Sequence, residues 1–456
     1  MKFPLLIRAA AIAAVAVAIL FPLALVTGKV AERRTRAAEV ESAFARETSG
    51  PQTVAGPLLA LACEETVVEE RVVKRAGNDD TVAEQKTRAC PTAYFPPRTL
   101  DIAAQVPVES RHRGIYPIRL YRAALAFAGE FDWPSPPPQE GAVSRRWKGA
   151  SIVVATGDAR GIKSVSPLAW GTGTIAFAAG RSDRQPGFSL EAPLGEFGAV
   201  AATGAVAYRF SMELIGTGHL MLGPVGDTTR IRLASDWPHP SFMGAFSPDE
   251  RKVGPQGFEA AWKTTHFATG GRAAWQPRFQ KGQPMRWEKA TGFSLADPVN
   301  VYSLSYRATE YGFLFVLFTF AGLALAEVTA GIRLHPVQYA MAGSGLAVFF
   351  LLLLALAEHI AFGEAYAAAA GACMLLLACY LRHPLGSPGR TMTFLGALLV
   401  LYGSLYALLR SEDHALLAGS LLVFGMLAAG MIATRRLDWG SLAARLDPAP
   451  AKGTAA

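Results

Sequence analysis

Long apolar segments lie at both ends of the chain. Residues Ala9–Val26 form an uninterrupted apolar run of 18 residues. A helix of about 20 apolar residues is long enough to cross the hydrocarbon core of a bilayer. The last third of the chain contains five more such segments, at Tyr311–Ile332, Val337–Ala357, Ile360–Tyr380, Met392–Leu409 and Ala415–Ala433. The pattern therefore predicts six transmembrane helices, one before and five after a long intervening region.

The first apolar segment has two interpretations. A cleaved signal peptide has an apolar core of about 7–15 residues and ends at a small-residue cleavage site. This run is longer, and the charged stretch Lys29–Arg36 follows it without a clean A-x-A site. We therefore favour an uncleaved anchor at residues 1–27, with a signal peptide as the alternative.

The intervening region, residues 28–307, has the pattern of β structure. Apolar and polar residues alternate with period two in Ile115–Phe131, Ala205–Met221 and Thr228–Leu233, with glycine-rich turns between such segments. Val30–Ala45 is the exception, because it fits a helix that continues out of the first span. We expect a large antiparallel β-sandwich-like region beside the α-helical membrane bundle.

A short sequence echo suggests an internal duplication of this region. Asp132-Trp133-Pro134 recurs as Asp236-Trp237-Pro238, and Gly187-Phe-Ser-Leu190 recurs as Gly292-Phe-Ser-Leu295 at nearly the same offset. The repeat units would cover about 115–200 and 205–300. Chance similarity in a chain rich in glycine and alanine is the alternative.

The basic residues of the short loops predict the orientation of the spans. Arg333, Arg382 and Arg390 lie on the same side as both termini, whereas the opposite loops are mostly acidic. Cytoplasmic loops carry the excess of Lys and Arg, so both termini should be cytoplasmic. Arg33, Arg34 and Arg36 disagree, because they follow the first span on the outside. The expected order is an anchor at 1–27, an external region at 28–307, a five-helix bundle at 311–433 and a cytoplasmic tail at 434–456.

Composition excludes some classes of protein. Charged residues make up 18% of the chain and hydrophobic residues 51%, which excludes a disordered chain or a coiled coil. The net charge of +8 is dispersed, with no run of Lys and Arg longer than two, so we expect no nucleic-acid partner. The oligomeric state has no signal in the sequence.

Two of the four cysteines lie in the external region. Polar arms flank the turn signal at Ala76–Gly77, and folding them as a hairpin brings Cys63 opposite Cys90. A disulfide is expected in an oxidising compartment, and two separate thiols are the alternative. Cys373 and Cys379 are six residues apart on one predicted helix, so they are expected to be packing residues.

Catalytic and metal-binding motifs are missing from the sequence. It contains no G-x-S-x-G, no H-E-x-x-H and no close histidine pair, so we expect neither a catalytic site nor a cofactor or metal. Carboxylates at the spans are the stronger signal, because a carboxylate in lipid is costly. They are Glu310, Glu327, Glu358, Glu364, Glu412 and Asp413. Glu327 has Arg333 nearby as a candidate partner. The others lie at outer span ends, and three alternative roles follow for them: carrying ions or protons, marking the membrane boundary, or docking the β region.

Several tracts resemble the cell envelope integrity protein CreD family. The first covers Gly331–Tyr339 and includes Arg333, His335, Pro336 and Gln338, and the second ends in Glu358-His359-Ile360. Further tracts are Arg410–Leu417, Thr434–Trp439, Arg111–Tyr116, Asp297–Tyr302 and Gly50-Pro51-Gln52. The resemblance covers nearly the whole chain, although position 410 is Arg and position 414 is His, where the family pattern has a neutral amide and an aromatic residue.

The resemblance implies a bacterial inner-membrane protein with a large periplasmic region. The resemblance implies links to envelope integrity, to a sensor-kinase regulon and, in enteric bacteria, to colicin tolerance, without an established catalytic activity. We therefore expect a non-enzymatic protein that contacts the lipid bilayer and binds a periplasmic or envelope partner. A proton-coupled transporter that uses Glu327, Glu358 and Glu364 is one alternative. An enzyme acting on envelope glycan or lipid is the other.

Overall fold

The computed structural model describes residues 3–75, 78–133, 144–180, 189–196, 204–270, 289–295, 301–330, 332–410 and 415–435. The chain divides into two compact units. Residues 1–38 and 299–456 form the helical unit, and residues 39–298 form the sheet unit. The sequence division at residues 27 and 307 followed hydropathy, whereas this division follows the packing of the chain.

The first helix, α1, runs from Phe3 to Glu47. It therefore continues past the apolar run into the charged stretch, as the pattern of Val30–Ala45 predicts. Its apolar part belongs to the helical unit, and its last residues, from Glu39 onward, belong to the sheet unit.

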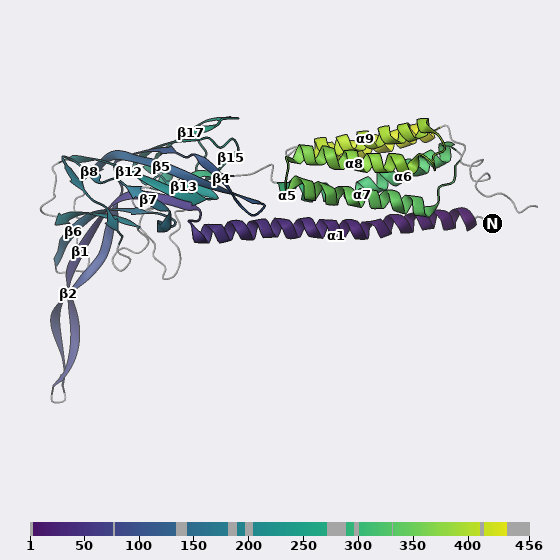
Figure 1. The fold of residues 1–456 in the computed structure, drawn as a ribbon. Helices are drawn as coiled ribbons and strands as arrows, with labels where there is room; N and C mark the ends of the chain where they lie inside the picture. The colour runs from purple at the N-terminus through teal and green to yellow at the C-terminus, as the bar shows by residue number, and fades with distance from the viewer. Residues whose placement is uncertain are drawn as a thin grey trace, which may run out of the picture. The chain divides into compact units, whose positions relative to one another are not determined.

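Six further helices make up the rest of the helical unit over the described residues (Figure 1). They are α5 (Val301–Glu310), α6 (Gly312–Ala330), α7 (Pro336–Ala357), α8 (Phe362–Leu381), α9 (Pro388–Arg410) and α10 (Ala415–Thr434). Many of their large apolar side chains face outward: Leu375 is 67% exposed and Phe424 69%. Helices that are apolar on all sides belong in lipid rather than in water.

Among the described residues, four helices are long and apolar enough to cross a membrane, or five if α5 and α6 count as one bent span. Those four are α1, α7, α8 and α9. The sequence predicted a span over Tyr311–Ile332, but the helical segment begins earlier, at Val301, and bends by 44° between α5 and α6. Hydropathy missed α5 because it is amphipathic, with a buried face at Tyr302, Leu304 and Ala308.

The sheet unit contains two sheets. The first has the strand order β10-β11-β6-β1-β13-β18-β15, with β2 also paired to β1. Its strands are β1 (Gln52–Arg75), β2 (Asn78–Phe95), β6 (Ser144–Ala155), β10 (Ala178–Ala179), β11 (Leu190–Glu196), β13 (His219–Gly223), β15 (Pro240–Gly244) and β18 (Thr291–Leu295).

The second sheet has the order β16-β17-β14-β3-β5-β12-β8-β9, with β4 paired to β5 and β7 to β12. Its strands are β3 (Thr99–Gln105), β4 (Val108–Arg113), β5 (Tyr116–Asp132), β7 (Ile162–Val165), β8 (Leu168–Trp170), β9 (Gly173–Ile175), β12 (Ala205–Thr217), β14 (Thr228–Ser235), β16 (Glu250–Gly254) and β17 (Gly257–Thr265). Two short helical turns lie beside these strands, η1 (Ala159–Gly161) and α3 (His266–Thr269).

Both sheets are mixed, which corrects the prediction of an antiparallel region. β1 pairs in parallel with β13, and β3 pairs in parallel with β14. More than a hundred residues separate the partners in each pair, so no hairpin sets their relative direction. Period-two alternation identifies the faces of a strand, but it contains no information about strand direction.

Buried residues from both sheets form one hydrophobic cluster. Strand β12 shows why: Val206, Tyr208, Phe210, Met212 and Leu214 are buried and alternate with exposed positions. Phe210 lies opposite Phe127 of β5, and their rings stack with centroids 4.7 Å apart. The first sheet contributes fully buried residues such as Leu58, Ile152 and Phe293.

Strands β1 and β2 form a long hairpin that projects from the rest of the sheet unit (Figure 1). Its register places Cys63 opposite Cys90, and Cys63 is disulfide-bonded. Strand β6 pairs with β1 only as far as Thr66. Among the described residues, the hairpin beyond Thr66 is therefore a two-stranded ribbon.

Asp132-Trp133 lies at the end of β5 and Asp236-Trp237 directly after β14, and both strands pair with β3, from opposite sides. β5 is antiparallel to β3 and β14 is parallel to it. The Gly-Phe-Ser-Leu echo does not test the duplication, because Gly187 and Phe188 lie outside the described part of the chain. The internal duplication stays a prediction.

Candidate functional site

The tract from His335 to Tyr339 builds the start of α7. His335 is the residue before the helix, and Pro336 occupies the first helical position, where its missing N–H is not needed. The Nδ1 atom of His335 accepts from the N–H of Val337 at 3.3 Å, and the Gln338 Oε1 atom accepts from the N–H of His335 at 2.9 Å. This is a reciprocal capping box, so His335 and Gln338 fix the point at which α7 begins.

Tyr339, one turn into α7, binds the buried carboxylate of Glu327 on α6. Its hydroxyl donates to the Glu327 Oε2 atom at 3.0 Å. Tyr339 is fully buried and Glu327 is 8% exposed. The ring of Phe320 lies across Tyr339 with centroids 5.3 Å apart. A buried carboxylate needs such a donor, because burial without a partner is costly.

Sequence reasoning proposed Arg333 as the partner of Glu327 and missed Tyr339. That Arg333 pairing stays a prediction. The missed signal was the tyrosine itself. Tyr339 follows the tract that starts α7, so it lies close to the end of the preceding helix, α6.

At the opposite end of α7, Glu358 forms an ion pair with α1. The Arg33 Nε atom lies 3.5 Å from the Glu358 Oε1 atom. Glu358 is the C-cap of α7, where the helix dipole disfavours a negative charge. A nearby cation offsets that cost. This ion-pair partner of Glu358 therefore lies on α1.

The arginines that violated the charge rule therefore have local partners. Beside Arg33, the guanidinium of Arg34 lies over the ring of Tyr306, 5.8 Å from its centroid. Such a contact stabilises a cation at the edge of an apolar unit. Charge counting treats these arginines as topology signals, whereas their contacts within the helical unit give them a structural role.

Helix α1 packs closely on the helical unit. Its buried residues Ile19, Leu23, Val26 and Val30 follow one face at helical spacing. Glycines make room for two of them: a Cβ atom at Gly343 would lie 2.7 Å from Ile19, and one at Gly312 would lie 2.7 Å from Leu23. The first apolar segment is thus a packed helix of the helical unit, and its retention as an anchor stays a prediction.

Two further predicted residues lie at the surface of the helical unit. His359 and Glu364 are exposed, and Glu364 lies in the first turn of α8, where a carboxylate is favourable. Glu412 and Asp413 lie outside the described residues. Tyr339, the partner of Glu327, lies near the start of α7 and Glu358 at its end, and α7 has 22 residues and is therefore about 33 Å long.

A buried polar cluster lies between these two ends, and no sequence signal indicated it. The Tyr402 hydroxyl donates to the Cys373 sulfur at 3.2 Å, and the Tyr366 hydroxyl donates to the Tyr402 carbonyl at 2.7 Å. The Cys373 thiol donates to the carbonyl of Gly345 at 3.3 Å. Cys373 is thus buried in the core, as expected for a packing residue.

The sheet unit has its own polar junction where α1 ends. The Gln52 side chain is fully buried and binds the backbone of Asp158 twice: its Nε2 atom donates to the carbonyl at 3.1 Å, and its Oε1 atom accepts from the N–H at 3.1 Å. Arg160 donates to the carbonyl of Arg46 at 2.5 Å and also binds Asp158. Its hydrogen bonds lower the pKa of the Asp158 carboxyl. We call these residues, with Ser49, the α1 junction.

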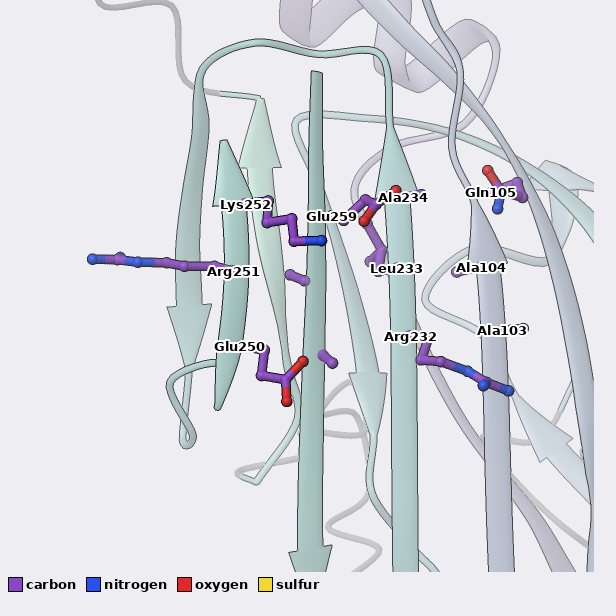
Figure 2. Close-up of a pocket in the computed structure, with 12 residues that line it drawn as sticks. Ala103, Ala104, Gln105, Arg232, Leu233, Ala234, Glu250, Arg251, Lys252 and Glu259 are labelled. Carbon is purple, nitrogen blue, oxygen red and sulfur yellow. The ribbon is translucent and has the colours of Figure 1, made fainter. Parts of the chain in front are cut away.

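A groove lies on the outer face of the second sheet (Figure 2). Its volume is about 360 Å³, and strands β3, β14, β16 and β17 line it. Ala103 and Ala261 are small residues of the lining, and Arg232, Glu250, Lys252 and Glu259 supply charges of both signs. Figure 2 shows Glu250 and Lys252 directed toward β17, with Arg251 directed away. A second hollow of about 670 Å³ shares Gln105, Lys252 and Glu259 with it.

Within the described part of the chain, no group of three or more His, Cys, Asp or Glu side chains has the arrangement of a metal site. The polar features of this part of the chain are contacts between helices, the cap of α7, the α1 junction and the groove of the second sheet.

The chain is similar to known proteins over nearly its whole length. The family described as "Inner membrane protein CreD" matches residues 4–440. The inner membrane protein CreD of Escherichia coli (strain K12) is 34% identical over 445 residues, which cover 96% of this chain and 94% of that protein.

Proposed function

Because the chain belongs to the inner membrane protein CreD family, we propose that it supports the integrity of the cell envelope by binding a periplasmic or lipid partner, without catalysis. Family membership places the chain in the bacterial inner membrane as a multi-pass protein. The envelope role, the partner and the absence of catalysis are the proposal.

The proposed topology has six spans and two cytoplasmic termini. α10 is apolar from Leu417 to Ile432 and serves as the sixth span. The sheet unit then lies in the periplasm, with its two sheets packed as a sandwich. The ion pair of Arg33 with Glu358 supports this topology, because it gives a reason for basic residues after the first span.

One observation carries the non-transport part of the proposal. Two of the three carboxylates predicted to move ions are engaged locally: Glu327 with Tyr339, and Glu358 with Arg33. These contacts fix helix ends and helix pairs. A binding protein needs such a fixed scaffold, whereas a proton path needs carboxylates that exchange partners.

The groove of the second sheet is the proposed partner surface. β16 is an edge strand, so its outer backbone groups are open to another strand over the described residues. The mixed charges of Arg232, Glu250, Lys252 and Glu259 fit a protein segment that carries both signs of charge.

Site-specific crosslinking in the intact envelope tests this surface. A photoreactive residue at Lys252 should capture a discrete partner, whereas one at Lys163 should not. Lys163 is an exposed lysine on β7 of the same sheet and does not line the groove. Equal capture from both positions, or none from Lys252, would contradict partner binding in the groove.

The transporter alternative rests on one observation, the burial of Glu327 in the helical unit. It predicts that Glu327→Gln abolishes a proton-dependent flux in proteoliposomes while the protein stays folded. The enzyme alternative rests on the carboxylates Glu250 and Glu259 in the groove. It predicts that Glu250→Gln or Glu259→Gln abolishes envelope complementation although partner capture persists.

A further inference from the structure

The connection between α8 and α9 contains a pocket that the proposed function does not use. Its volume is about 360 Å³. The residues that line it are Cys379, Arg382, His383, Gly386, Ser387 and Pro388. In the proposed topology this connection faces the cytoplasm, at the surface of the membrane.

The pocket is part of an ordered loop. Leu385 is fully buried and holds the middle of the connection against the helices. Its carbonyl accepts from Arg390 at 3.4 Å. Gly386 has φ +66°, a left-handed conformation that favours glycine, and it directs the chain toward the start of α9.

The charge around the pocket is positive. No Asp or Glu occurs between Glu364 and Glu412, whereas Arg382 and Arg390 both lie in that stretch. Among the described residues, no carboxylate lies within ion-pair distance of Arg382 or His383. A guanidinium binds phosphate through paired hydrogen bonds, and the Ser387 hydroxyl in the same lining is a further donor. The lining therefore suits an anion with several acceptor oxygens.

Apolar surface continues from the pocket along both helices. Leu375, one turn before Cys379 on α8, is 67% exposed. Met392, one turn after Pro388 on α9, is 69% exposed. α8 and α9 pack against each other, so these side chains extend an apolar surface away from the cationic lining. A free anion would leave this apolar surface uncovered, whereas the acyl chains of a lipid would pack against it.

We propose that this pocket binds the phosphate of an anionic phospholipid. Arg382 and His383 pair with the phosphate, Ser387 donates to it, and the acyl chains lie along Leu375 and Met392. Basic pockets between helices on the cytoplasmic side of a membrane protein are suited to such headgroups.

Cys379 provides a built-in reporter for the test. It is exposed and lines the pocket, whereas the other free cysteine, Cys373, is buried. The experiment measures the alkylation rate of Cys379 by peptide mapping in the purified full-length protein in detergent. Short-chain phosphatidylglycerol, short-chain phosphatidylcholine and inorganic phosphate are added separately. Phosphatidylglycerol should slow alkylation several-fold, and the other two should leave the rate near that of the untreated protein.

Two substitutions sharpen the result. Arg382→Gln should remove the protection by phosphatidylglycerol, and Arg382→Lys should keep part of it. Arg435→Gln is the matched control, because Arg435 is an exposed arginine at the end of α10 that does not line the pocket. Arg435→Gln should keep the full protection. If Arg382→Gln fails to fold, as judged by its elution and melting, His383→Gln replaces it with the same expected loss.

Three results would overturn the proposal. Equal protection by phosphatidylcholine would mean that only apolar contact matters. Protection by inorganic phosphate alone would make the pocket a site for a free anion. Full protection in Arg382→Gln and His383→Gln would remove the cationic lining from the explanation. The proposed topology fails separately, if lipid protects Cys379 but an impermeant reagent reaches it from the periplasm.

Discussion

The hydroxyl of Tyr339 on α7 donates to the carboxylate of Glu327 on α6, and both side chains are buried. The contact joins two helices that are consecutive in the chain, at the end where His335 and Gln338 start α7. One short tract therefore specifies both where a helix begins and which buried acid it pairs with.

Removing the hydroxyl should take one hydrogen bond from this carboxylate. We expect Tyr339→Phe to destabilise the protein by about 1 kcal/mol, the usual net contribution of one hydrogen bond. Thermal unfolding of the full-length protein in lipid nanodiscs measures the effect. Tyr380→Phe, at a position 37% exposed, is the control and should melt like the parent. Equal melting of all three proteins would show that the hydrogen bond does not contribute to stability.

The Arg33–Glu358 pair should show measurable coupling. The Arg33 side chain is 47% exposed and that of Glu358 only 10%, so solvent screens the pair in part. We expect a coupling energy of about 1 kcal/mol in a double-mutant cycle of Arg33→Ala and Glu358→Ala. Lys29→Ala with Glu32→Ala, an exposed pair on the same helix, is the control and should show less coupling. Strictly additive effects at Arg33 and Glu358 would contradict the pairing.

The hairpin register predicts a specific disulfide. Non-reducing peptide mapping of the mature protein should find Cys63 joined to Cys90. In the chain-entropy model, a disulfide that closes a loop of this size stabilises the folded protein by about 3–4 kcal/mol, so Cys63→Ser should lower the melting temperature. Cys373 supplies an internal control, because it should stay a free thiol. Ready alkylation of both Cys63 and Cys90 without reductant would disprove the bridge.

His219 should make stability depend on pH. Burial lowers its pKa below the ordinary value of 6.5. The unfolded chain then binds a proton more readily than the folded one, so stability is full above pH 6.5 and falls as the pH drops through and below that value. Melting temperatures measured from about pH 7.5 to about pH 5.5 should decline, and His219→Gln should flatten the decline. His112→Gln, at an exposed position, should leave the slope unchanged.

Much of the architecture was predictable because it depends on local pattern. The alternation in Ile115–Phe131 and Ala205–Met221 predicts β5 and β12, and the apolar runs predict α7, α8 and α9. The parallel pairing of β1 with β13 was not predictable, because nothing local links strands so far apart in the chain. The internal duplication is hard to predict for the same reason, because it depends on how strands far apart in the chain are arranged.

The candidate site divides in the same way. His335, Pro336 and Gln338 lie within four residues of each other, so their role as a helix start can be read from sequence chemistry. The pairing of Glu327 with Tyr339 depends on which faces of α6 and α7 meet, and that of Glu358 with Arg33 on how far α1 extends. Both depend on packing between segments, which one sequence does not specify.

The α1 junction has a consequence for the order of events during synthesis. The carbonyl of Ser49 accepts from the hydroxyl of Thr217, 168 residues later in the chain. At a synthesis rate of 5–20 residues per second, Ser49 is made on the order of ten seconds before Thr217. The end of α1 is therefore among the first parts of the sheet unit to be made, but its contacts are complete only after Thr217 has been added. A stalled nascent chain that ends before Thr217 should be cut by protease just after Glu47, whereas the finished protein should resist.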